Sequence, residues 1–98
     1  MDSTVSLPMV TVYLPSVLRA RAGHRARLAV AGATVREIIE ALDAAAPGLR
    51  FNLCHETGAL RPYVNIFLGK VNIRYLDGLD TPVSAGATLH ILQSVAGG

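Results

Sequence analysis

The chain has 98 residues, of which 51% are hydrophobic and 16% are charged, and its net charge is +2. This length fits one domain with a single apolar core. One cysteine, Cys54, excludes an intramolecular disulfide framework, and no apolar run approaches the ~20 residues of a membrane span. Residues 1–4 lack the basic segment of a secretory signal. The sequence therefore predicts a soluble cytoplasmic domain that does not associate with membranes.

Positive charge is concentrated in the first third of the chain. Residues 1–36 carry five arginines against one acid, whereas residues 37–98 carry four basic and six acidic groups. The five are Arg19, Arg21, Arg25, Arg27 and Arg36. No aromatic residue is interleaved among them and no RNP-like string is present, so nucleic acid is not the expected partner. We interpret the arginines as the solvated face of a hairpin, with steering of an acidic partner protein as the second possibility.

Two strands are expected near the N-terminus. Residues 9–14 alternate apolar and polar side chains, which is the period of a half-buried strand, and Pro15 ends it. A loop over residues 16–23 leads to a second alternating segment at 26–30. These segments predict an antiparallel pair.

One amphipathic helix follows. Thr34 and Glu37 form a capping box, in which the threonine hydroxyl accepts from a backbone N–H and Glu37 reaches back to the N–H of Thr34. Apolar residues then recur with helical spacing. They are Val35, Ile38, Ile39 and Leu42. Pro47 and Gly48 predict that the helix ends near Ala45.

Residues 47–62 show no clear period and are expected to form a long connection, with a short helical turn around 49–53. Cys54 and His55 are neighbours here, but adjacent residues rarely converge on one ion and no second Cys-His cluster supplies ligands. We expect no metal site, and Cys54 is interpreted as a small apolar filler of the core.

Three further strands are expected in the C-terminal half. Residues 63–68 alternate, and Gly69-Lys70 suits a type II′ turn into a strand at 71–75. The last strand, 88–93, leads directly to the C-terminal tail.

The tail is Val95-Ala96-Gly97-Gly98. Glycine has no Cβ to pack and loses much freedom on ordering, so this segment is expected to stay flexible. Four extended residues reach roughly 13–14 Å, enough to carry the Gly98 carboxylate into a partner's active site. A chain of this composition would also end in two glycines occasionally by chance.

The predicted order is two strands, a helix and three strands, which is an α+β arrangement with one main helix on a mixed sheet of about five strands. This layout is that of the β-grasp, or ubiquitin-like, fold. With the tail Val95-Ala96-Gly97-Gly98 and the string Tyr63-Val64-Asn65-Ile66-Phe67, the chain resembles ubiquitin-like sulfur carriers of the ThiS/MoaD family, most closely the CysO type. We expect a β-grasp domain over 1–94 and the tail over 95–98.

The resemblance implies a carrier and co-substrate that is not itself an enzyme. An E1-like adenylyltransferase/sulfurtransferase would adenylate the Gly98 carboxylate with ATP, and sulfide or a persulfide would displace AMP to leave a thiocarboxylate. Val95, Ala96 and Gly97 would thread the enzyme's channel. The chain has no phosphate-binding loop, so ATP would be bound by the partner and no cofactor by the chain itself. A sulfur-accepting biosynthetic enzyme would follow, with cysteine or a related sulfur metabolite as the favoured product.

Phe67 and Leu92 are the predicted docking residues. Alternation places Phe67 on the sheet face away from the helix, where an aromatic residue can anchor a partner; the competing interpretation is packing under a loop. Two other functions stay open. One is a ubiquitin-like modifier that forms isopeptide bonds through Gly98, and the other is a non-covalent β-grasp binding module.

Overall fold

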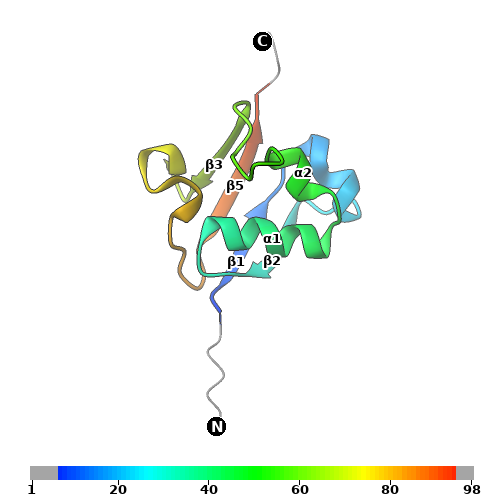
Figure 1. Ribbon diagram of the computed structural model, residues 1–98. Coiled ribbons are helices and arrows are strands. Elements are labelled where there is room, and N and C mark those ends of the chain that lie inside the picture. The colour runs from blue at the N-terminus through cyan, green and yellow to red at the C-terminus, as the bar shows by residue number, and fades with distance from the viewer. Residues whose placement is uncertain (1–6, 95–98) are drawn as a thin grey trace.

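A mixed five-stranded sheet organises the chain in the computed structural model, which describes residues 7–94 (Figure 1). The strands lie in the order β2-β1-β5-β3-β4. Their bounds are Met9–Tyr13 for β1, Arg27–Ala31 for β2, Val64–Leu68 for β3, Val71–Asn72 for β4 and Thr88–Gln93 for β5. β1 pairs antiparallel with β2 and parallel with β5, which is antiparallel to β3. The predicted β-grasp fold is confirmed.

The main helix, α1 (Val35–Ala45), begins at the predicted capping residue. The Glu37 N–H donates to Oγ1 of Thr34 over 3.2 Å. The carboxylate of Glu37 accepts from the Ala33 N–H at 2.8 Å, one residue earlier than the capping box predicts. The first bond satisfies a backbone donor that the first helical turn leaves without an intrahelical partner, and the second ties the residue before the cap to that turn.

The connection after α1 contains the expected short helix, α2 (Leu49–Leu53). Gly48 precedes it with a φ of 99°, a conformation that side chains with a Cβ rarely adopt. Asp43 Oδ1 accepts from the backbone N–H of Gly48 and of Arg50, at 3.0 and 3.1 Å. These bonds tie the start of α2 to the end of α1.

Two predicted boundaries were wrong. The expected loop at 16–23 is mostly a 3₁₀ helix, η1 (Ser16–Ala22). The strand expected at 71–75 ends at Asn72, because the Asn72 side chain accepts from the Arg74 N–H at 2.9 Å and starts the 3₁₀ helix η2 (Ile73–Tyr75). A third 3₁₀ helix, η3, covers Gly78–Asp80. The β3–β4 hairpin is confirmed, and Gly69 has a φ of 60°, as the first position of a type II′ turn requires.

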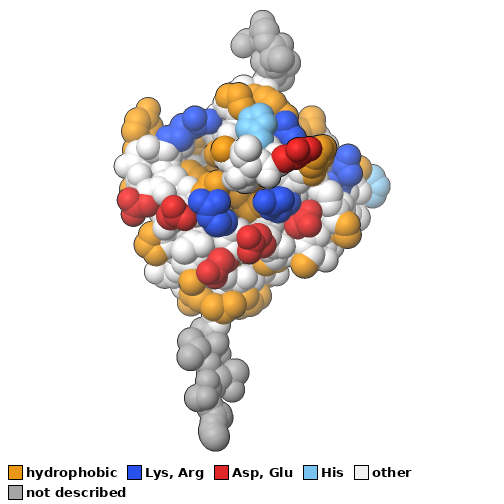
Figure 2. Space-filling view, in the orientation of Figure 1, with side chains coloured by type: hydrophobic (Ala, Val, Ile, Leu, Met, Phe, Trp, Pro, Cys, Tyr) orange, Lys and Arg blue, Asp and Glu red, His pale blue; other side chains and the backbone are white. Residues whose placement is uncertain are grey.

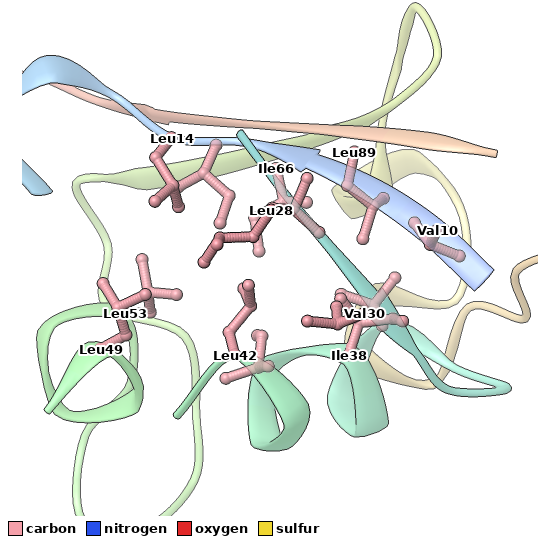
Figure 3. Packing of buried hydrophobic residues seen from close by; sticks show 14 of the residues in the cluster. Val10, Leu14, Leu28, Val30, Ile38, Leu42, Leu49, Leu53, Ile66 and Leu89 are labelled. Carbon is pink, nitrogen blue, oxygen red and sulfur yellow. The ribbon is translucent and has the colours of Figure 1, made fainter. Parts of the chain in front are cut away.

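The apolar core lies between one face of the sheet and the two α-helices. Alternate residues of the strands point toward α1 and α2, and the labelled side chains meet between the two layers (Figure 3). Leu42 of α1 and Leu49 and Leu53 of α2 are fully buried there. The helices therefore cover one face of the sheet, and the remaining strand residues lie on the second face, which we call the open face.

Candidate functional site

The root of the C-terminal tail is held at the middle of the sheet. β5 pairs with β1 on one side and with β3 on the other, up to the pair Val64 and Gln93. Beyond β5, the Ser94 N–H donates to the carbonyl oxygen of Tyr63 at 2.8 Å. The predicted covalent residue Gly98 and the predicted threading residues Val95, Ala96 and Gly97 lie outside the described residues.

One residue from each strand contributes to a row across the open face, which we call the aromatic row. The strand register pairs its members in the order Arg27, Tyr13, His90, Phe67 and Asn72. At its centre, the rings of Tyr13 and His90 stack with 4.6 Å between centroids and 5° between planes. The row therefore runs from a charged edge through three rings to an amide.

The two predicted docking residues both lie on the open face. Phe67 sits in the aromatic row opposite His90 and is half-buried. Leu92 is 51% exposed and pairs with Asn65, nearer to the tail. Large half-exposed apolar side chains are suitable anchors for a partner protein. Their role in docking stays a prediction.

Tyr13 and His90 were not among the predicted site residues. Each is the outward-facing residue of an alternating strand, so its exposure was predictable from the period of two. Their contact was not, because it requires β1 and β5 to be parallel neighbours in one particular register. The half-exposed ring pair adds to the surface that a partner could cover.

The described acidic side chains lie on the helix side of the molecule and not on the strands. None of the five strands contains an aspartate or glutamate. Three acids lie on α1, and Asp80 of η3 pairs with Arg36 of α1 at 3.2 Å. Figure 2, in the orientation that shows α1, has acidic side chains on this side, interspersed with Lys and Arg side chains. A partner on the open face would therefore meet no acidic group from the strands.

Cys54 packs in the apolar core, as the sequence predicts. Burial raises the pKa of its thiol, although Arg50, Arg36 and Arg61 act in the opposite direction. A cavity of about 30 Å³ beside it, lined in part by Arg36, Arg50 and Gly58, has room for about one water molecule.

Within residues 7–94, no three His, Cys, Asp or Glu side chains gather as a metal site would require. In the same range, no helix is both long and apolar enough to cross a bilayer.

Residues 12–98 match the model of the ThiS family. The chain belongs to this family. It is 33% identical to the sulfur carrier protein CysO of Mycobacterium tuberculosis over 91 residues, which are 91% of this chain and 98% of the relative. A chain in the crystal structure of the Amycolatopsis orientalis BexX/CysO complex superposes with a TM-score of 0.85 and 36% identity, covering 91% of this chain and 99% of that one.

A further relative is the small archaeal modifier protein 3 of Haloferax volcanii, 33% identical over 66 residues, which are 67% of this chain and 71% of the relative. The CysO relatives are small sulfur carrier proteins. The protein is therefore a sulfur carrier of the ThiS/CysO type.

Proposed function

We propose that the Gly98 carboxylate is the group that carries sulfur. The supporting observation is that the match to the ThiS family extends through Gly98, and that the chain is hydrogen-bonded to Tyr63 as far as Ser94, just past β5 and four residues before Gly98. The carboxylate would thus lie within roughly 13–14 Å of a fixed point on the sheet.

In the proposed reaction, an E1-like enzyme binds ATP and the tail together. An oxygen of the Gly98 carboxylate attacks the α-phosphate, and pyrophosphate leaves. Hydrosulfide then attacks the acyl carbon, the bond to the AMP oxygen breaks, and a thiocarboxylate remains. Adenylation is needed because a carboxylate has no good leaving group, whereas AMP leaves readily.

The last residues of the tail suit passage through a narrow channel. Gly97 and Gly98 have no side chain, and Ala96 has one methyl group. We propose that Val95 and Ala96 lie at the channel entrance and that a Cβ on Gly97 would clash inside it. Phe67 and Leu92 would contact the same enzyme through the open face.

For the acceptor, we propose an enzyme of cysteine synthesis, or of a related sulfur metabolite. Similarity to the sulfur carrier protein CysO of M. tuberculosis over nearly its full length supports this choice. The chain itself would act as carrier and co-substrate in both steps.

A second candidate is a protein modifier that forms isopeptide bonds through Gly98. Similarity to the small archaeal modifier protein 3 of H. volcanii favours it. The two candidates share adenylation and differ in the product, which is a thiocarboxylate for the carrier and a lysine conjugate for the modifier.

Pyrophosphate release from ATP tests the adenylation step. The full chain is mixed with each E1-like enzyme of its host, beside variants that lack Gly98 or carry Gly97→Ala. We expect release with the full chain, none without Gly98, and strongly reduced release with Gly97→Ala. Equal release with and without Gly98 would contradict the proposal.

A further inference from the structure

Arginines gather at the end of the sheet from which the tail leaves. β1 and β5 are parallel, so their carboxyl ends lie at the same end of the sheet. Arg27 pairs with Tyr13, the last residue of β1, and Arg19 Nε donates to the Leu14 carbonyl oxygen at 3.1 Å. Figure 1 shows η1, in light blue, in the half of the molecule toward which β5 runs. We name Arg19, Arg25 and Arg27 the basic corner.

Two of these side chains are held in place by hydrogen bonds to backbone carbonyl oxygens of nearby residues. Arg19 Nε bonds to Leu14, and Arg25 Nε donates to the Ala22 carbonyl oxygen at 2.8 Å. Each guanidinium has five N–H donors, so the terminal nitrogens are left for other acceptors. A side chain that is already oriented loses less entropy when it binds.

Arg21 does not belong to this group. A Cβ placed on Gly48 would lie 3.0 Å from its Nη1, so its guanidinium lies over the turn between α1 and α2. Within residues 7–94, the ion pair of the structure joins Arg36 to Asp80, and no described acid pairs with the basic corner. With no acid in the strands beside it, the corner gives the tail end of the sheet a positive potential.

We propose that the basic corner docks on an acidic protein surface beside the tail channel of the activating enzyme. The inference rests on the proposed function, since it assumes an enzyme that takes the tail. That enzyme must reach within roughly 13–14 Å of Ser94, so its surface lies over this end of the sheet. The aromatic row begins at Arg27, which makes the corner continuous with the surface that carries Phe67, and aromatic and arginine side chains are enriched in protein interfaces.

Charge reversal at Arg27 tests the proposal, with Arg50→Glu as the matched control. Both residues are exposed arginines, but Arg50 lies on α2, on the helix side of the sheet. Association of each full chain with the activating enzyme is followed by stopped-flow fluorescence, at about 50 mM salt and again at about 500 mM. We expect Arg27→Glu to slow association about tenfold at low salt and little at high salt, and Arg50→Glu to change it less than about twofold.

Equal rates for Arg27→Glu and the unmodified chain at low salt would overturn the inference. So would an equal loss in both variants, which would indicate an effect of net charge alone. Loss in the Arg27 variant of binding to a DNA duplex, with enzyme association unchanged, would assign the corner to nucleic acid instead.

The behaviour of the unmodified chain distinguishes a failure of the proposed function from a failure of the inference alone. If no E1-like enzyme converts it, the proposed function fails, and the inference falls with it. If the unmodified chain is converted and Arg27→Glu associates normally, only the inference fails.

Discussion

The phenol ring of Tyr13 stacks on the imidazole ring of His90, with centroids 4.6 Å apart and ring planes 5° from parallel. The two residues lie near opposite ends of the chain and meet because β1 and β5 are parallel neighbours. The pair occupies the middle of the open face, between Arg27 and Phe67. It thus joins the first and last strands beside the root of the tail.

A double-mutant cycle should detect this stack in the stability of the domain. Cross-strand aromatic pairs contribute roughly 0.2–1 kcal/mol beyond their separate contacts. We expect Tyr13→Ala and His90→Ala, combined, to cost about 0.5 kcal/mol less than the sum of the single costs in urea unfolding. Strict additivity would show that the rings do not interact in solution.

Phe67 should contribute to binding of the activating enzyme. Aromatic side chains near the centre of an interface often cost about 2 kcal/mol or more when truncated. We expect Phe67→Ala to weaken the complex by roughly thirtyfold in calorimetry. Tyr75→Ala is the control, because Tyr75 is 84% exposed on η2, outside the aromatic row. An equal effect of both substitutions would contradict the prediction that the enzyme docks on the open face.

The elements of this fold were largely predictable from local patterns. Alternation in β1, β2 and β5 and the cap at Thr34 each follow from residues close together in the chain. The early end of β4 depends on the Asn72 side chain, which accepts a hydrogen bond from the Arg74 N–H. This local bond offers the backbone an alternative to continuing the strand. The aromatic row depends on pairings between distant segments, which no local pattern contains. Consequently Phe67 could be assigned to a face, but its neighbours could not be named.

The cap of α1 gives a direct test of the helix start. Loss of an N-cap hydroxyl leaves a backbone donor without its partner and costs about 1 kcal/mol. We expect Thr34→Ala to lower the free energy of unfolding by that amount, measured in urea. Ser84→Ala, an exposed position outside any helix or strand, should change it by less than about 0.5 kcal/mol. A neutral Thr34→Ala would mean that the bond to Glu37 is not formed in solution.

The buried thiol of Cys54 should make stability fall in alkaline solution. Burial raises its pKa in the folded state, so the folded protein holds the proton more tightly than the unfolded chain. The resulting stabilisation is present below the ordinary thiol pKa of about 8.5 and is lost as the pH rises above it. We expect Cys54→Ala to show a smaller decline in urea stability between about pH 8 and 10 than the unmodified protein. Parallel pH profiles would contradict this account of the thiol.

The most direct test of the central claim is the intact mass of the untagged protein after incubation with ATP, sulfide and each E1-like enzyme of its host. Replacement of one carboxylate oxygen by sulfur adds about 16 Da, and fragmentation should locate the change at Gly98. We predict this gain for the full chain and no gain for a chain that lacks Gly98. An unchanged mass with every enzyme, or a gain located at another residue, would contradict the assignment of Gly98 as the sulfur-carrying group.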